Sequence, residues 1–98
     1  MIDWKLITGF EWDEGNARKN AEKHDVSQAE AEQLFFNEPL LIVTDVMHSA
    51  VEIRLHALGK TDEARKLHTT FTLRQQGTKI RVISARNMSR KEREYYEK

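Results

Sequence analysis

Three strand-forming segments in the second half of the chain constrain its fold more than any other feature. They cover residues 51–58, 67–74 and 79–86. All three are rich in the aliphatic, aromatic and threonine side chains that favour strands. Gly59 and Gly77 lie at the junctions between them, and residues 75–78 have the composition of a hairpin connection. The sequence therefore predicts an antiparallel meander.

Helix signals lie on both sides of these strands. The residues that can cap helix N-termini are Asp13, Ser27 and Ser89. Glu30 and Glu92 follow the two serines by three positions, which is the spacing of a capping box. The first helix is expected to end near His24. Shorter strands are expected at residues 10–12 and 40–43. This order predicts one α+β domain over residues 1–98, a small antiparallel β-sheet with two N-terminal helices packed on one face and a C-terminal helix.

Composition excludes several kinds of site. The chain has no cysteine, which excludes a disulfide framework, a zinc–thiolate site and a thiol nucleophile. It has no run of about 18 apolar residues. Its N-terminus lacks a basic segment followed by an apolar one, so we expect neither a membrane span nor a secretory signal. The histidines have no metal-ligand spacing, and no P-loop or GxSxG motif is present. We therefore expect a cytoplasmic protein with no cofactor and no metal site.

Charge is balanced over the whole chain but unevenly distributed along it. Residues 1–50 carry four basic and ten acidic side chains, whereas residues 74–98 carry eight basic and three acidic ones. This asymmetry predicts a basic working surface on an otherwise acidic protein. The net charge of zero argues against indiscriminate binding to duplex DNA, in which charge supplies most of the affinity.

Alternation along the predicted strands places polar side chains on one face of the sheet, because successive side chains in a strand point to opposite faces. The residues that share this polar face are Glu52, Arg54, His56, His68 and Arg74. One interpretation is an ordinary solvated face on which opposite charges pair across strands, such as Glu52 with Arg74. The other is a functional face, on which the histidines serve acid–base chemistry near neutral pH.

A second cationic cluster lies where the last strand meets the last helix. It comprises Arg81, Arg86, Arg90, Lys91 and Arg93. A guanidinium group is always charged and presents a rigid fork of donors, which suits it to binding phosphate groups. The alternative interpretation is a solvated basic helix face beside an edge strand.

A series of short motifs along the chain has a distinctive order and spacing. The motifs are residues 10–13, 20–27, Asp45, His48, 52–54, 58–59, Arg65, Leu67, 71–74, 80–86, 89–93 and 95–97. Together they cover nearly everything from Phe10 onward and resemble a BrnT toxin. The sequence departs from this pattern at Asp25, where the family usually has glycine. Residues 1–9 form an extension that the resemblance does not explain.

The resemblance implies a fold similar to that of RelE-type toxins and a metal-independent endoribonuclease that inhibits translation. It also implies an antitoxin of the BrnA type with a ribbon–helix–helix part that binds DNA. The toxin is then expected to form a hetero-oligomer with this antitoxin and to reach operator DNA only through it. The alternative function is a non-catalytic protein-binding module that acts with a ribbon–helix–helix partner in transcriptional autoregulation.

The reaction that fits this resemblance is attack by an RNA 2′-hydroxyl group on its own phosphate. The nucleophile belongs to the substrate, so the protein needs only to position it, move protons and stabilise charge. Glu52 is the candidate base, with His56 or His68 as alternatives. Arg65 and Arg86 are the candidates for holding the scissile phosphate.

Further residues are candidates for binding the RNA chain. They are Trp12, Arg54, His56, His68, Arg74, Arg81 and Arg93. Trp12 has two interpretations. Its ring could stack on an unpaired base, a contact that contributes about 1–3 kcal/mol per base, or it could close the core at the start of the first helix.

Overall fold

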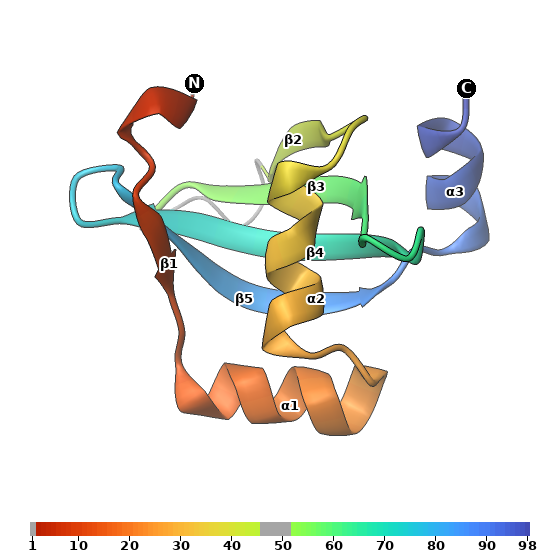
Figure 1. Ribbon diagram of the computed structural model, residues 1–98, viewed down its shortest axis with the longest axis horizontal. Coiled ribbons are helices and arrows are strands. Elements are labelled where there is room, and N and C mark those ends of the chain that lie inside the picture. The colour runs from red at the N-terminus through yellow and green to blue at the C-terminus, as the bar shows by residue number, and fades with distance from the viewer. Residues whose placement is uncertain (1, 46–51) are drawn as a thin grey trace.

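The computed structural model describes residues 2–45 and 52–98, and Figure 1 shows how its helices and strands are arranged. The elements follow in the order η1 (Trp4–Leu6), β1 (Gly9–Glu11), α1 (Glu14–His24), α2 (Gln28–Gln33), η2 (Leu34–Phe36), β2 (Leu41–Asp45), β3 (Arg54–Lys60), β4 (Lys66–Arg74), β5 (Lys79–Asn87) and α3 (Arg90–Tyr96), where η marks a short 3-10 helix. The α+β class and the predicted helices are confirmed. His48 and Val51, the first residue of the strand predicted over 51–58, lie outside the described residues. The observed strand, β3, begins three residues later, at Arg54, and ends at Lys60.

The strands form one sheet in the order β1-β5-β4-β3-β2. The pairs β2–β3, β3–β4 and β4–β5 are antiparallel, as the meander predicts. β1 instead pairs with β5 in parallel, with Gly9 opposite Lys79, so the sheet is mixed. These two strands are far apart in the sequence, and no hairpin connection dictates their relative direction. The predicted likeness to RelE-type toxins stays a prediction.

Local capping signals explain where the helices begin. The side chain of Asp13 accepts a hydrogen bond of 3.1 Å from a backbone N–H of the first turn of α1. At α2, Ser27 and Glu30 each accept a bond of 3.1 Å from the backbone N–H of the other. Ser89 and Glu92 repeat this arrangement at α3. Both predicted capping boxes are therefore confirmed.

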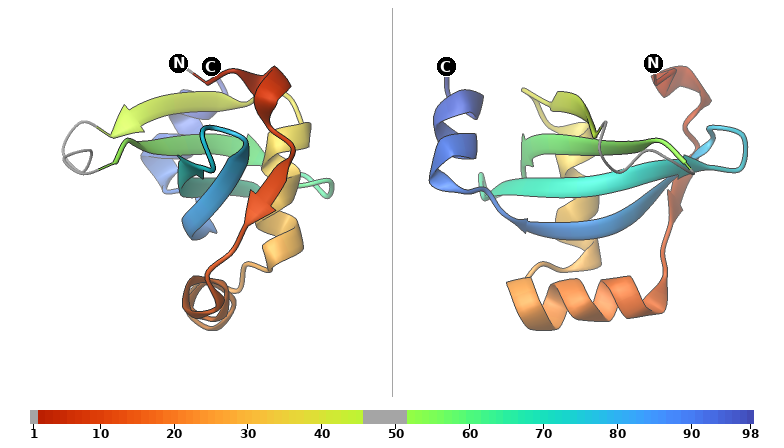
Figure 2. Two further views of the ribbon diagram at one scale, coloured as in Figure 1. Left: turned by 90° about the vertical axis from the view of Figure 1, so that its left-hand side faces the viewer. Right: turned by 180° about the vertical axis from the view of Figure 1, so that it is seen from behind.

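The main core lies between one face of the sheet and the segment α2–η2, while α1 lies along β5 (Figure 2). It is formed by Val26, Ala31, Leu34, Leu55, Ala57, Leu67, Phe71, Ile80, Val82 and Ala85. Phe71 is fully buried and contacts the ring of Phe35 edge-on, with the centroids 5.1 Å apart. Because alternate residues of β3, β4 and β5 fill this core, the residues between them face the opposite side.

The N-terminal extension also packs on the core. Ile2 and Ile7 lie against the buried cluster, and the ring of Trp4 lies 6.2 Å from that of Phe35. The backbone N–H of Thr8 donates to the carbonyl of Thr78 at 2.8 Å, immediately before β1 begins. The extension therefore leads into the edge strand β1 and contributes apolar side chains to the core.

Helix α3 lies at the opposite end of the sheet from the N-terminal segment (Figure 1). Its Tyr96 is buried with Leu58 and Met88, and the Tyr96 hydroxyl donates to the carbonyl of Pro39 at 2.6 Å. Leu58 points away from the main core, so α3 closes one end of the second sheet face. We call the remainder of that face the open face. It carries Arg54, His56, His68, Thr70, Arg74, Arg81 and Arg86.

Candidate active site

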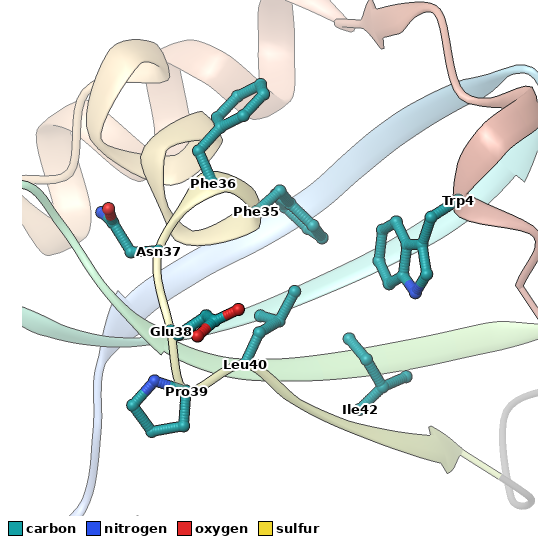
Figure 3. A pocket seen from close by; sticks show the side chains of 8 residues that line it. All are labelled: Trp4, Phe35, Phe36, Asn37, Glu38, Pro39, Leu40 and Ile42. Atoms are coloured by element: carbon teal, nitrogen blue, oxygen red, sulfur yellow. The ribbon is translucent and has the colours of Figure 1, made fainter.

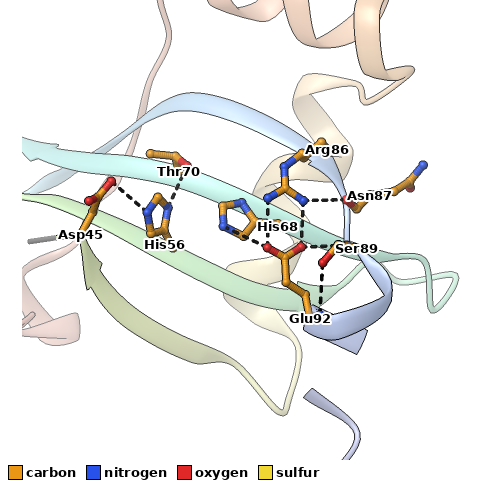
Figure 4. Close-up of polar contacts among 8 residues, drawn as sticks. All are labelled: Asp45, His56, His68, Thr70, Arg86, Asn87, Ser89 and Glu92. Atoms are coloured by element: carbon orange, nitrogen blue, oxygen red, sulfur yellow. Dashed lines mark hydrogen bonds and ion pairs between the residues drawn. The ribbon is translucent and has the colours of Figure 1, made fainter. Parts of the chain in front are cut away.

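Two histidines lie side by side on the open face, as the alternation predicts. His56 is in β3, and His68 is in the neighbouring strand β4, where it pairs with Leu58. The centroids of the two rings are 4.8 Å apart, with an angle of 40° between the ring planes. Figure 4 shows the two rings with their polar neighbours. Two adjacent imidazoles can together accept and donate a proton.

His56 is held at both of its ring nitrogens. Its Nε2 lies 3.0 Å from Oδ2 of Asp45, the last residue of β2. Its Nδ1 lies 2.9 Å from the hydroxyl oxygen of Thr70 in β4. The Asp45 side chain is only 12% exposed, so most of its surface is shielded from water.

An ion pair between β5 and α3 completes the cluster. Arg86 donates from Nη1 and Nη2 to the two carboxylate oxygens of Glu92, at 2.8 and 3.0 Å. The backbone N–H of Ser89 donates to the same carboxylate at 2.8 Å, so the capping box also orients it. Arg86 pairs with His68 in the sheet, and Oε2 of Glu92 lies 3.8 Å from Nε2 of His68. Glu92 therefore connects Arg86 to the histidine pair.

Hydrogen bonds, burial and neighbouring charges shift the pKa values of three residues in the cluster, Glu92, Arg86 and His68. The hydrogen bond from Arg86 lowers the pKa of Glu92 to about 2, so this carboxylate is charged at neutral pH. The same hydrogen bond raises the pKa of Arg86. Burial, followed by the positive charge of Arg86, lowers the pKa of His68 below 6.5. His68 is thus a neutral imidazole at neutral pH, and its Nδ1 is buried without a hydrogen-bond partner among residues 2–45 and 52–98.

Acid is expected to destabilise the protein in two steps. The pKa of His68 is lower in the folded protein than in the unfolded chain, so stability falls as the pH drops below 6.5. The stability that charged Glu92 contributes is complete above pH 4.5 and is lost between pH 4.5 and about 2. Urea unfolding over this pH range measures both steps as a fall in the free energy of unfolding.

Two variants separate these steps. Glu92→Gln should reduce the second step, while glutamine keeps the capping box. His68→Asn should remove the first step, because asparagine does not titrate. An unchanged loss of stability between pH 4.5 and 2 in Glu92→Gln would contradict the role given to this carboxylate.

Other charged residues of the open face form ion pairs away from the histidines. Nη2 of Arg74 lies 3.1 Å from Oε1 of Glu52, which confirms the predicted neighbours. Six positions along β4 separate Arg74 from His68, a span of roughly 20 Å. Arg81 pairs with Glu11 at 2.7 Å. The structure therefore does not bring the candidate base Glu52 to the histidine pair.

Arg65 lies beside the connection between α1 and α2, away from the histidine pair. Its Nη1 donates to the carbonyl of Asp25 at 2.7 Å and to Glu30 Oε2 at 3.0 Å. Its Nη2 donates to the carbonyl of His24 at 3.2 Å, and its Nε to Asn87 Oδ1 at 2.9 Å. These contacts attach the α1–α2 connection to the sheet. The two arginines that the sequence assigns to the scissile phosphate are therefore not brought together.

Of three other predicted site residues, Trp12, Arg93 and Arg54, only Arg54 lies next to the histidine cluster. Trp12 donates from Nε1 to Oε2 of Glu32 at 2.7 Å and packs against the core cluster, which favours its core-closing interpretation. Arg93 is exposed on α3, and its Nη1 donates to the carbonyl of Met88 at 2.9 Å. Arg54 is the first residue of β3 and pairs with the last residue of β2, so it borders the histidine cluster.

Three members of the cluster are absent from the predicted site residues. They are Asp45, Thr70 and Glu92. Alternation places Thr70 on the same face as His68, and this signal is present in the sequence. Glu92 is recognisable in the sequence as a capping residue. The position of Asp45 beside His56 depends on the register between β2 and β3, and no two-residue turn determines this register.

A groove of about 740 Å³ lies on a different part of the molecule (Figure 3). It is lined by Trp4, Phe35, Phe36, Asn37, Glu38, Pro39, Leu40 and Ile42. Glu38 is the only titratable side chain of this lining. The groove has no paired groups for proton transfer, so the histidine cluster is the better candidate for catalysis.

Residues 2–45 and 52–98 contain neither a metal-binding cluster nor a membrane-spanning helix. No group of three or more histidine, aspartate or glutamate side chains within these ranges is placed to hold a metal ion. No helix there combines the length and the apolar character that crossing a membrane requires.

Comparison with known proteins identifies the family of the chain. The family described as ribonuclease toxin, BrnT, of type II toxin-antitoxin system matches residues 12–92. The crystal structure of the Brucella abortus ribonuclease toxin, BrnT, is similar with a TM-score of 0.61 and 21% sequence identity, over 85% of this chain and 99% of that one. This structural likeness shows a common fold. No curated protein matches the chain. Because the family match spans most of the sequence, the chain belongs to the BrnT family of ribonuclease toxins of type II toxin–antitoxin systems.

Proposed function

We propose that this toxin is a metal-independent endoribonuclease that cleaves RNA through attack of a 2′-hydroxyl group on the adjacent phosphate. The cleavage of cellular RNA would inhibit translation. The observation that most supports this proposal is the pair of imidazoles 4.8 Å apart, with Arg86 opposite His68 in the sheet. Family membership supports RNA as the substrate.

The histidine pair can perform both proton transfers of this reaction. One imidazole accepts the proton of the 2′-hydroxyl group as its oxygen attacks phosphorus. The bond from phosphorus to the 5′-oxygen breaks, and the other imidazole, in its protonated form, gives a proton to that oxygen. The products are a 2′,3′-cyclic phosphate and a 5′-hydroxyl end. We assign the base role to His68, because its lowered pKa keeps it neutral at neutral pH.

This assignment gives the role of base to His68, one of the two alternatives to Glu52 that the sequence offers. Glu52 forms an ion pair with Arg74 at the other end of β4, whereas His68 lies opposite Arg86. Arg86 would stabilise the negative charge that develops on the phosphate oxygens. Its fork holds the Glu92 carboxylate in the free protein, and a phosphate group fits the same donors. On binding, a phosphate group of the RNA would therefore displace the Glu92 carboxylate from Arg86 or share the guanidinium with it.

We also propose that the antitoxin is of the BrnA type and covers the open face. A type II toxin implies an antitoxin partner, and covering the histidine cluster would silence the activity. An acidic segment could pair with Arg74, Arg81, Arg86 and Arg93. The first three of these are already paired with acids of the chain, so the segment must displace Glu52, Glu11 and Glu92.

Incubation of the purified toxin with RNA tests the proposed function. We expect endonucleolytic cleavage that persists in EDTA, because the proton transfers are assigned to side chains. The products should carry 2′,3′-cyclic phosphate ends, which acid treatment converts to monophosphates. Loss of cleavage on chelation, restored by adding back a divalent cation, would contradict the mechanism. Absence of any cleavage would favour the non-catalytic protein-binding module.

A further inference from the structure

Asp45 and Thr70 hold the ring of His56 from opposite sides. The carboxylate of Asp45 lies 3.0 Å from Nε2, and the hydroxyl of Thr70 lies 2.9 Å from Nδ1. The three residues come from adjacent strands of one sheet, β2, β3 and β4. The backbone register of these strands therefore positions the ring as well as its hydrogen bonds.

The two partners differ in what they can accept and donate. A carboxylate can only accept a hydrogen bond, so the proton of neutral His56 must be on Nε2. A hydroxyl can donate or accept, so it suits Nδ1 whether that nitrogen carries a lone pair or a proton. Thus, His56 can gain and lose a proton at Nδ1 without breaking its contact with Asp45.

From this arrangement we propose that Asp45 is a positioning residue of the ribonuclease site, which holds His56 in the tautomer with its proton on Nε2. This inference rests on the proposed ribonuclease function and goes beyond it. It places the proton exchange of His56 at Nδ1, on the side of Thr70. Asp45 would not touch the RNA but would determine which nitrogen of His56 takes part in the reaction.

Among the described residues, the carboxylate in direct contact with His56 is that of Asp45. Arg54 lies two positions earlier on the same strand. The ring of His68 in β4 lies 4.8 Å from that of His56, tilted by 40°, and its own carboxylate neighbour is Glu92, at 3.8 Å. Arg86 in β5 is beyond His68 and is held by the same Glu92. The cluster therefore contains two carboxylates, each facing a different histidine.

Substitution of Asp45 by asparagine should change the tautomer of His56. The amide of asparagine can donate to Nε2, which allows the proton to move to Nδ1. In the ¹⁵N-labelled toxin, two-bond proton–nitrogen correlations of the imidazole rings report which nitrogen is protonated. We expect the Nε2–H pattern for His56 in the wild-type protein and an Nδ1–H or mixed pattern in Asp45→Asn. A wild-type ring protonated on Nδ1 would overturn the inference.

Kinetics provides the second readout. In Asp45→Asn, kcat should fall by about 10- to 100-fold, less than the roughly 10²–10⁴ that a complete proton transfer contributes. KM should remain close to that of the wild type, because Asp45 does not touch substrate. Thr70→Ser, which keeps the hydroxyl group, should lose less activity than Thr70→Val. The matched control is Asp62→Asn, since Asp62 is an exposed carboxylate that accepts from Asn37 at 3.0 Å, away from the cluster.

The results distinguish failure of this inference from failure of the proposed function. Cleavage by the wild type with full kcat in Asp45→Asn would reject the role of Asp45 and leave the ribonuclease activity intact. No cleavage by the wild type would reject the proposed function and, with it, any positioning role in that reaction. A fall in kcat with an unchanged thermal melt and an altered His56 tautomer would support both.

Discussion

Replacement of Arg86 by lysine is expected to lower the rate of RNA cleavage by about 10²–10³, the usual loss for one contact that stabilises transition-state charge. Lysine keeps the positive charge but cannot present two parallel donors to a phosphate group. In the structure, the guanidinium uses this fork on both oxygens of Glu92, at 2.8 and 3.0 Å. Single-turnover cleavage of RNA by the purified variant measures the effect.

Arg90→Lys is the matched control for this variant. Arg90 is an arginine on α3 that also faces a carboxylate, with 3.4 Å between its Nε and Glu94, but its side chain is 86% exposed. Arg90→Lys should therefore cleave RNA like the wild type. Thermal melts establish that both variants are folded. If Arg86→Lys were folded and fully active, its role in phosphate stabilisation would be rejected, and the Arg86–Glu92 pair would have a purely structural role.

Replacement of Arg65 by lysine is expected to reduce stability rather than catalysis. One ammonium group cannot reach the carbonyls of His24 and Asp25, the carboxylate of Glu30 and the side chain of Asn87 together. Hydrogen bonds to charged groups contribute about 1.5–3 kcal/mol each, and the contributions do not add fully. We expect a loss of about 2–3 kcal/mol in the free energy of unfolding. For a domain of this size, this loss lowers the melting temperature by roughly 4–8 °C per kcal/mol.

The control for Arg65→Lys is the same substitution at Arg18, an exposed residue of α1. Surface substitutions of this kind usually change stability by no more than about 0.5 kcal/mol. Below its melting temperature, Arg65→Lys should retain the wild-type kcat. A variant that melted like the wild type but had lost activity would return Arg65 to the phosphate-binding role that the resemblance implies.

The parts of the fold that the sequence predicts well depend on signals within a few residues. Both capping boxes are visible because serine and glutamate are three positions apart. Alternation over two strands is sufficient to place His56 and His68 on one face. Glu52 also lies beside Arg74 as predicted, although it precedes β3 and is not itself in a strand. These predictions succeed because side-chain direction follows directly from the geometry of helices and strands.

Other features depend on contacts between distant segments. The parallel pairing of β1 with β5 joins residues 9–11 to residues 79–81, and no local signal predicts it. The position of Asp45 depends in the same way on the register of β2 against β3. Arg65 is a different case, because it precedes the buried Leu67 by two positions and alternation would place both on the core side.

Cleavage of a matched pair of RNAs tests the central claim most directly. One RNA carries ribose throughout, and the other carries a single 2′-deoxy nucleotide on the 5′ side of the linkage that the toxin cleaves. If the 2′-hydroxyl is the nucleophile, the toxin should cut the first RNA to a 2′,3′-cyclic phosphate end and leave the same linkage of the second intact. Cleavage of the 2′-deoxy linkage at a comparable rate would show that water attacks the phosphate, and would contradict the mechanism assigned to His56, His68 and Arg86.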